Sequence, residues 1–341
     1  MTDQRLSTEP EKLRAPNIRD VARLAGVSYQ TVSRVLNNAT SIRPSTKQRV
    51  LNVIDELGYR PNQAARALVT SRTRTIGVLS GGSAHYGPTT ALHAIEVAAR
   101  EAGYRLSITY TAGDYESIKV GLDYLVGQNV EAIIVIAPQL RVFDAIEDLA
   151  LALPFVTLDS TGRTLGHSIS VDQHVGGQMA TRHLIDLGHT EIVHLAGPQD
   201  WIEAEARMQG FLHEVNGADL NTHPPILGDW TPQFGFHAGR ELLGRRDFTA
   251  VFSANDQMAL GLIHAFYDAG LSVPRDISIV GFDDIPEAAH FLPPLTTVRQ
   301  DFAEVGRRSL GLLMDALNGV PEASYEQIPP EFVLRSSTAA L

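Results

Sequence analysis

Hydrophobic residues follow two different patterns along this chain. From residue 75 to about residue 300, short apolar runs alternate with segments that have helical spacing. Apolar runs without strict alternation are typical of strands buried on both faces of a parallel sheet. The predicted strands are TIGVLS from 75, RLSITY from 105, EAIIVIAP from 131, FVTLD from 155, EIVHLAG from 191, AVFSAND from 250 and ISIVGFDD from 277. Since a single open sheet rarely needs roughly 270 residues, we predict an α/β body with two similar lobes and a crevice between them.

The second pattern consists of three short helical stripes in the N-terminal part of the chain. The first stripe ends at Gly26, a residue suited to a left-handed helix end. Ser28 can cap the second stripe, in which apolar residues recur at i, i+3 and i+4. The third is predicted to begin with a capping box of Ser45 and Gln48 and to end at Gly58. Two short helices joined by a Gly-containing turn, with a third packed behind them, match a helix-turn-helix.

The polar face of the second predicted helix carries side chains that can read base pairs. Opposite its apolar stripe lie Tyr29, Gln30, Ser33, Arg34 and Asn37. Gln can pair with adenine through two hydrogen bonds, Arg can bind guanine or a phosphate, and Tyr can pack on thymine methyl groups. A helix that docks in the major groove needs such side chains near its beginning. We therefore predict contacts with double-stranded DNA, the alternative being an ordinary solvated helix face.

The distribution of charge separates the same two regions. The whole chain has a net charge of -11, but residues 1–74 hold 13 Lys and Arg against 6 Asp and Glu, which gives +7. The remaining residues hold 15 basic and 33 acidic side chains, which gives -18. A basic region attracts phosphates and an acidic surface is repelled by them, so the asymmetry favours a polyanion-binding head on an acidic body.

The segment GYRPNQAARALVTSRTRT, residues 58–75, joins these two regions. Pro61 and Asn62 precede Ala-rich helix formers that are too few to make a stable isolated helix in water. If the segment folds on DNA, Leu68 is the apolar side chain that can unstack a base step in the minor groove. An ordinary linker is the alternative.

Polar residues at the ends of predicted strands mark a candidate ligand crevice. Ligands of open α/β sheets bind outside the carboxyl ends of the strands, where Asp159, Asn255 and Asp283 lie. Their carboxylates and amide can exchange several hydrogen bonds with a sugar diol, and Arg207 can add a fork of donors. The aromatic rings expected to cover an apolar sugar face are those of Trp230 and Phe302. The alternatives are a helix cap or turn for the polar residues and a core position for the aromatic residues.

Other features of the sequence limit the function classes. The chain has no cysteine, which excludes disulfides, thiol catalysis and Cys-ligated metals. It contains no G-x-S-x-G, G-x-x-x-x-G-K or H-E-x-x-H motif, and we expect no cofactor and no bound metal. Neither a signal peptide nor an apolar stretch of about 20 residues is found, so we expect a cytoplasmic protein without a membrane partner.

Several motifs resemble those of the LacI family of bacterial transcriptional repressors. They are IRDVARLAGVSYQTVSRVLNN, YRPN, ANDQMALG, VGFDD and PPLTTVRQDF, and the likeness covers nearly the whole chain after the first 16 or so residues. Some stretches are similar to lactose-type members of the family. The resemblance implies a helix-turn-helix domain at 17–61, a hinge helix and linker at 62–74, and a two-lobed, periplasmic-binding-protein-like body at 75–341. Within the body, lobe 1 is expected at about 75–171 and 300–329, and lobe 2 at about 172–299 and 330–341.

The resemblance also implies partners and site residues. It implies a homodimer that binds pseudo-palindromic operator DNA and releases or retains it in response to a small effector. The DNA-binding positions are Ser28, Tyr29, Gln30, Ser33, Arg34, Asn37, Tyr59, Asn62 and Leu68. The effector-binding positions that match lactose-type members are Asp159, Arg207, Trp230, Asn255, Asp283, Gln300 and Phe302. Asn255, Trp230 and Gln300 together favour a sugar, and the likeness to lactose-type members implies one of galactoside type. Arg207, Asp283 and an aromatic residue would also suit a purine.

Two stretches depart from the lactose-type pattern and bear on the effector. Glu203 and Glu205 stand where those sequences carry a small hydroxyl residue and a base, and the loop SGGSAHYG after the first strand also differs. The sequence VLRSSTAAL at the end has no heptad run, so we expect a dimer rather than a tetramer held by a coiled coil.

Two other function classes remain open at the level of sequence. A sugar-acting enzyme could use the acids Asp283 and Asp284, although neighbours in sequence do not make a catalytic pair. A secreted sugar-binding receptor would suit the body but not the basic head or the missing signal peptide.

Overall fold

The computed structural model describes residues 16–36, 41–60, 72–82, 85–137, 139, 142, 146, 153–158, 167–220, 223–245, 247–320 and 326–341. The chain divides into two compact units, residues 1–73 and 74–341. The predicted hinge helix at 62–69 and four predicted site residues, Asn37, Asn62, Leu68 and Asp159, lie outside the described residues.

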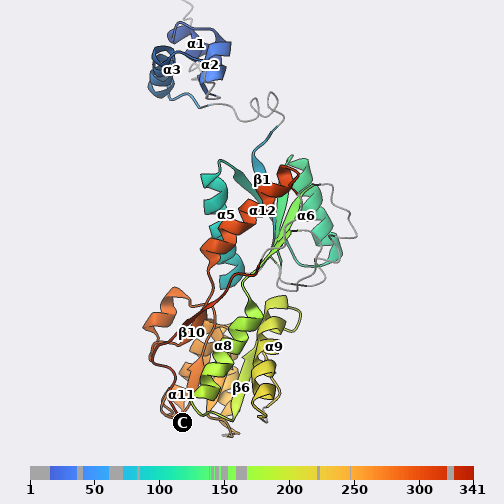
Figure 1. The fold of residues 1–341 in the computed structure, drawn as a ribbon, viewed down its shortest axis with the longest axis vertical. Coiled ribbons are helices and arrows are strands. Elements are labelled where there is room, and N and C mark those ends of the chain that lie inside the picture. Colours follow the sequence, from blue (N-terminus) through green and yellow to red (C-terminus); the bar gives the residue numbers. More distant parts are fainter. Residues whose placement is uncertain are drawn as a thin grey trace, which may run out of the picture. The chain divides into compact units, whose positions relative to one another are not determined.

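The N-terminal unit contains three helices, α1 (Ile18–Leu24), α2 (Tyr29–Leu36) and α3 (Pro44–Leu57), in the part that the structure describes (Figure 1). Ser28 caps α2 as predicted, since its Oγ accepts a hydrogen bond of 3.2 Å from the Thr31 N–H. Gly26 and Gly58 follow α1 and α3 with φ of 63° and 59°, the left-handed conformation that their sequence positions predict.

One helix start in this unit differs from the sequence-based expectation, and another was not predicted. The capping box predicted for Ser45 and Gln48 is wrong, because α3 begins at Pro44, which places Ser45 inside the helix, and Arg43 precedes the helix without a side-chain cap. Proline suits a first helical position, since its fixed φ is already helical and its missing N–H would be unpaired there. A capping box is present instead at α1, between Asn17 and Asp20.

The first lobe of the C-terminal unit is built on a five-stranded parallel sheet in the order β2-β1-β3-β4-β5. The strands are β1 (Thr75–Gly81), β2 (Arg105–Thr111), β3 (Ala132–Ile136), β4 (Phe155–Leu158) and β5 (His167–Ile169). Helices α5 (Tyr86–Glu101) and α12 (Phe302–Leu317) pack on one face, and α6 (Tyr115–Gly127) packs on the other (Figure 1). Both faces are thus covered, as the apolar runs predict.

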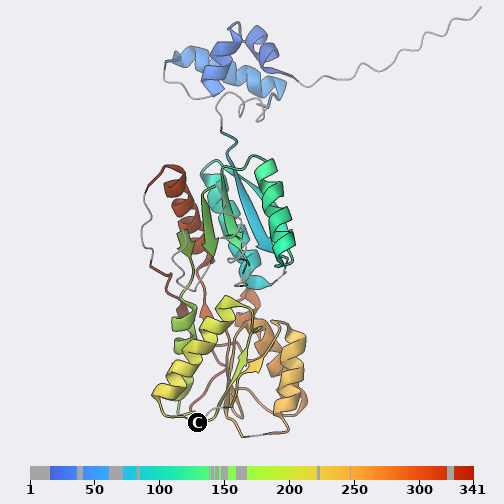
Figure 2. The same ribbon diagram turned by 90° about the vertical axis from the view of Figure 1, so that its right-hand side faces the viewer.

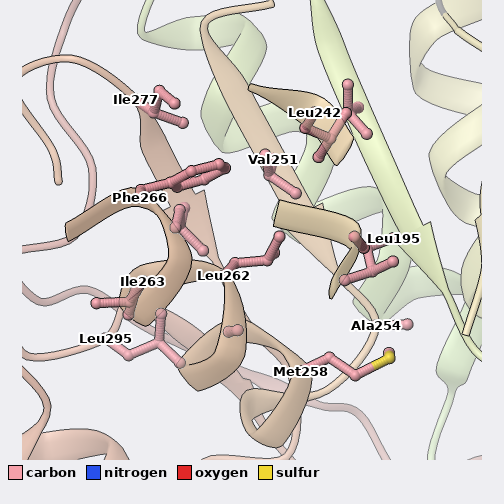
Figure 3. Close-up of a cluster of buried hydrophobic side chains, with 14 of the residues drawn as sticks. Leu195, Leu242, Val251, Ala254, Met258, Leu262, Ile263, Phe266, Ile277 and Leu295 are labelled. Atoms are coloured by element: carbon pink, nitrogen blue, oxygen red, sulfur yellow. The ribbon is translucent and has the colours of Figure 1, made fainter. Parts of the chain in front are cut away.

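The second lobe repeats this plan with a four-stranded parallel sheet in the order β7-β6-β8-β9. The strands are β6 (Ile192–Ala196), β7 (Ile226–Leu227), β8 (Ala250–Ser253) and β9 (Ser278–Val280). Helices α8 (Gln173–Asp186) and α9 (Ile202–Gly217) cover one face, and α10 (Pro232–Leu242) and α11 (Asp256–Asp268) cover the other. Figure 3 shows the core beneath α11, where Leu262 and Phe266 meet Val251 of β8.

Three segments connect the lobes (Figures 1 and 2). The first runs from β5 to α8, the second from β10 (Thr297–Arg299) to α12, and the third from α12 to β11 (Glu331–Val333). Strands β10 and β11 pair antiparallel, and backbone hydrogen bonds join Ile328 to Ser170 and Asp172, which links the third connection to the first. Residues far apart in sequence therefore meet between the two sheets.

The predicted α/β fold class is confirmed, and all seven predicted strands are present. The pattern missed β5, β7, β10 and β11, which have only two or three residues each. No helix among the described residues is long and apolar enough to cross a membrane.

Candidate functional site

A pocket in the C-terminal unit is lined by residues of both lobes. It encloses about 760 Å³ of space free of protein atoms, part of it open to solvent. Six of the seven predicted effector-binding residues line it, namely Arg207, Trp230, Asn255, Asp283, Gln300 and Phe302. The pocket is also lined by residues that were not predicted from the sequence to contact a ligand, among them His85, Tyr86, Gln173, Trp201, Glu203 and Gln257. The pocket thus has the size and the mixture of apolar walls and few polar groups that are common in small-molecule sites.

Asn255 serves both as a helix cap and as part of the pocket wall. It precedes α11, and its Oδ1 accepts a hydrogen bond of 2.9 Å from the Met258 N–H. Its Nδ2 donates to the Trp230 carbonyl at 3.0 Å. Trp230 has a φ of 71°, which is uncommon for a bulky residue, so this bond helps to hold a strained backbone that aims the indole. The cap and ligand interpretations of Asn255 are therefore compatible.

Arg207 of α9 is buried and held in one orientation. Its Nε donates to Gln173 Oε1 at 2.9 Å, its Nη1 donates to the Ala254 carbonyl at 2.5 Å, and its Nη2 lies 3.4 Å from Asp283 Oδ1. The guanidinium also lies over the Phe282 ring, 3.8 Å from its centroid. A guanidinium has five N–H donors, so these contacts fix it while leaving donors for a ligand.

Two glutamines complete a ring of hydrogen bonds with Arg207 and Asp283. Gln173 Nε2 donates to Gln300 Oε1 at 2.7 Å, and Gln300 Nε2 donates to Asp283 Oδ1 at 2.6 Å. Gln173 lies at the start of α8 and Gln300 just before α12, so the ring joins the first and second connections between the lobes. Both ends of the Gln300 amide bind protein groups, so this residue positions Asp283. The role of Gln173 could not be predicted from the sequence, because its hydrogen-bond partners are distant along the chain.

Burial shifts the pKa values of the ionisable groups around this ring. Burial raises the pKa of Asp283, and the charge of Arg207 and the Gln300 hydrogen bond oppose that rise. Burial also raises the pKa of Asp256 well above its ordinary value, with a further rise from the charge of Asp283. Asp256 accepts hydrogen bonds from Thr297 Oγ1 at 2.6 Å and from the Ile285 N–H at 2.9 Å. These contacts tie the Asp283 loop to α11.

Aromatic rings form much of the remaining wall. Trp201, just before α9, meets Trp230 edge-on with ring centroids 5.4 Å apart, and His85 of the first lobe meets Trp201 at 5.3 Å. Burial lowers the pKa of His85, and the charge of Asp229 opposes this. The lobes also meet through a backbone bridge between Gln139 and Trp201. Trp201 lines the pocket but is not among the predicted effector-binding residues.

In the N-terminal unit, α2 presents the polar face that the sequence predicts. Val32 and Val35 are buried in the core of the unit, whereas Tyr29, Gln30 and Arg34 are exposed. Tyr29 has 56% of its surface exposed. Three other predicted DNA-binding residues lie in the described part of the chain. Ser28 is exposed and Ser33 is half-buried. Tyr59 belongs to the core of the unit, and only 9% of the residue is exposed. Burial raises the pKa of Tyr59. Its DNA contact stays a prediction, and the low exposure leaves little of the residue for it.

Comparison with known proteins identifies relatives of both units. Residues 17–62 match the family described as "Bacterial regulatory proteins, lacI family", and residues 181–338 match "Periplasmic binding protein-like domain". The chain is 36% identical over 328 residues to the HTH-type transcriptional repressor PurR of Pasteurella multocida, covering 94% of this chain and 98% of the relative. It is 34% identical to the lactose operon repressor of Escherichia coli, covering 94% and 90% respectively.

The chain belongs to the LacI family of bacterial regulatory proteins. The LacI-family structures that it resembles include the lac repressor dimer bound to operator and the anti-inducer ONPF, with a TM-score of 0.87, 32% identity and coverage of 96% of this chain and 100% of that chain. They also include the transcriptional regulator CelR in complex with cellobiose, with a TM-score of 0.69, 30% identity and coverage of 94% and 99%. The chain is accordingly a DNA-binding transcriptional regulator with an effector-binding domain.

Membership of the LacI family favours regulation over the enzyme interpretation of Asp283 and Asp284. The structure gives these neighbours separate partners. Asp283 joins the ring with Arg207 and Gln300, whereas Asp284 binds Arg299 at 2.7 Å and Arg335 at 2.6 Å. Among the described residues, no group of three or more His, Asp or Glu side chains is arranged to hold a metal ion.

Proposed function

We propose that this LacI-family regulator is a transcriptional repressor that binds a pseudo-palindromic operator as a homodimer. The observation that carries the proposal is the exposed face of α2, on which Tyr29, Gln30 and Arg34 stand clear of the buried Val32 and Val35. These side chains have the hydrogen-bonding groups that distinguish base pairs in a major groove. A regulator of chromosomal DNA in bacteria works in the cytoplasm.

A dimer is supported by apolar side chains that the single chain leaves exposed. Tyr110 on the edge strand β2 and Tyr124 on α6 have 63% and 51% of their surfaces exposed. In the second lobe, Tyr267 and Leu292 have 77% and 88% exposed. A closed two-fold dimer covers the same patch on both copies and presents two DNA-binding heads to two half-sites.

The DNA-binding proposal is tested by selecting sequences from random double-stranded DNA with the purified full chain. We expect enrichment of a site with two-fold symmetry. Gln30→Ala should weaken binding to that site about 10-fold or more and relax the preference at one base pair in each half-site, because a bidentate base contact contributes roughly 1–3 kcal/mol.

Gln48→Ala is the matched control, because Gln48 is an exposed glutamine on α3 that binds Asn52. It should leave operator affinity unchanged. Enrichment of no sequence, or equal losses in the two variants, would contradict the assignment of α2 as the recognition helix.

We further propose that a small sugar of galactoside type binds the pocket and controls operator affinity. Arg207, Asn255 and Asp283 supply directional hydrogen-bonding groups, and Trp230 and Phe302 supply flat apolar surfaces, which together suit a polyhydroxylated ring. The lobes share the pocket, so a ligand there can favour one arrangement of the lobes over another. It changes operator affinity only if it binds the two arrangements unequally.

A tryptophan-fluorescence titration with galactosides, other sugars and purines tests the effector proposal, because the chain has only two tryptophans and both line the pocket. A saturable change with a galactoside that is altered in Trp230→Phe, together with a change in operator affinity, is the expected result. A response to a purine alone would replace the sugar with the second candidate, a purine effector, which Arg207, Asp283 and the aromatic walls would also accommodate.

A further inference from the structure

The indole of Trp230 lies directly against the backbone at the carboxyl end of β6. Gly197 is the first residue after this strand, and it is buried. A Cβ atom added there would overlap Cη2 and Cζ2 of the indole and lie 2.8 Å from Cζ3, whereas non-bonded carbon atoms are best separated by about 3.5–4.0 Å. The three nearest atoms all belong to Trp230, so the indole occupies the space that a side chain at position 197 would need.

Two physical reasons can require a glycine, and only one of them applies to Gly197. A positive φ favours glycine, because other residues are strained in that conformation. Gly197 is not among the glycines with a positive φ, so its backbone conformation does not by itself require glycine. The other reason is the close approach of another group to the backbone. The indole of Trp230 is that group, so position 197 requires glycine for lack of space.

The indole of Trp230 has little freedom to move aside. The Trp230 backbone has a φ of 71°, and its carbonyl accepts a hydrogen bond of 3.0 Å from Asn255 Nδ2. The guanidinium of Arg207 lies 5.5 Å from the centroid of the ring, and Trp201 meets the ring edge-on. Only 5% of Trp230 is exposed. The pocket is the open space that borders the ring, so a displaced ring would move into the volume available to a ligand.

We propose that Gly197 is a positioning residue that selects which ligands fit the pocket, because its missing side chain lets Trp230 lie against the end of β6. This inference rests on the proposed function, in which the pocket holds the effector. Gly197 itself is not among the residues that line the pocket, so it acts only through the indole. A methyl group at position 197 would move the ring by roughly 1 Å, which overpacks a site that holds a ligand.

The inference is tested by isothermal titration calorimetry on the full chain. The probes are methyl β-D-galactopyranoside, adenine and hypoxanthine, which represent the two effector candidates. Gly197→Ala should weaken binding of the probe that the unaltered protein binds by about 10-fold, which corresponds to about 1.4 kcal/mol. Gly217→Ala is the matched control, because Gly217 lies at the exposed end of α9 with no atom within 4 Å of the added carbon. It should leave the affinity unchanged.

The comparison that isolates the role of Gly197 is made in the Trp230→Phe background. A phenyl ring keeps a flat surface but lacks the indole atoms that the added carbon would overlap. The double variant should therefore bind the probe within about twofold of Trp230→Phe alone. A role limited to stability would lower the melting temperature of Gly197→Ala without changing the affinity of the folded protein. If Gly197→Ala does not fold, the double variant is the test, because the inference requires it to fold and to bind like Trp230→Phe.

Each other outcome overturns the inference in a distinguishable way. Equal affinity of Gly197→Ala and the unaltered protein would show that the ring does not enter the ligand volume. Equal losses in the two backgrounds would show that Gly197 does not act through Trp230. Loss of all binding in Trp230→Phe would assign the contact to the indole itself rather than to its position. Binding of no probe by the unaltered protein would reject the proposed effectors and with them the role of Gly197, while operator selection would still test the DNA-binding function separately.

Discussion

Replacing Arg207 with methionine should expose the cost of leaving Asp283 buried without a cation. Methionine keeps an unbranched apolar stem over Phe282 and removes the three contacts to Gln173, the Ala254 carbonyl and Asp283. Removing one partner of a buried ion pair costs about 3–5 kcal/mol. Two neutral acceptors that lose a donor account for about 1 kcal/mol each. The remaining roughly 2 kcal/mol is the contribution of the buried charge at Asp283.

That last contribution can be isolated with a double-mutant cycle. Asp283→Asn keeps an acceptor for the 2.6 Å hydrogen bond from Gln300 and removes the charge, so in the Arg207→Met background it should restore about 2 kcal/mol. The assay is denaturant unfolding of the full chain, followed by circular dichroism, for the wild type, both single variants and the double variant.

The pH dependence of the single variant provides an independent check. Without Arg207, the pKa of Asp283 in the folded protein rises further above that of the unfolded chain, because the group that opposed the burial effect is gone. A raised folded-state pKa stabilises the fold at low pH and loses that effect as the pH increases. The deficit of Arg207→Met should therefore shrink as the pH falls toward about 4. Additive losses in the cycle, or a deficit independent of pH, would refute the buried-charge reasoning.

Two further predictions concern the second lobe. His194 is stacked between Phe211 and Phe252, and burial lowers its pKa to about 4, so the unfolded chain binds the proton more readily and stability should fall as the pH drops from about 6.5 to 4. Over this pH range the free energy of unfolding should fall by about 3 kcal/mol. His194→Leu should remove this part of the pH dependence. An unchanged dependence of the unfolding free energy on pH in the variant would contradict a buried neutral imidazole. Gly261 lets α10 and α11 approach closely, because a Cβ there would collide with the Pro232 carbonyl. Gly261→Ala should lower the melting temperature, whereas Gly311→Ala, on the exposed side of α12 with no atom within 4 Å of the added carbon, should stabilise by roughly 0.5–1 kcal/mol. Equal effects of the two substitutions would argue against the close helix approach.

The elements that sequence reading predicts well are those with a strong local pattern. Seven apolar runs became strands, and Gly26, Ser28 and Gly58 mark the helix ends that their chemistry predicts. The start of α3 was misread because Ser45 with Gln48 fits a capping box as well as Pro44 fits a first helical position, and local sequence does not decide between them. Strands of two or three residues carry too few positions for a period to show.

The candidate site shows the same division between local and long-range information. Asn255 and Asp283 could be proposed because they follow strands, and Arg207 and Trp230 because they match a family pattern. The partners that hold them could not be predicted in this way. Gln173 and Gln300 are 127 positions apart and meet only because two connections between the lobes run beside each other. The position of Trp201 likewise depends on its backbone bridge to Gln139 of the other lobe.

The ring formed by Gln173, Gln300, Asp283 and Arg207 has a consequence for the protons that this site can hold. Arg207 can only donate and an ionised Asp283 can only accept, so both amides must point the same way around the ring. Gln173→Glu would still accept from Arg207, but it would face the Gln300 carbonyl. Turning the Gln300 amide over would move that conflict to Asp283. With a glutamate at position 173, the ring would contain two carboxyl groups, and one of them would have to be protonated. The two uncharged glutamine side chains therefore determine how many protons the ring around Arg207 and Asp283 can hold.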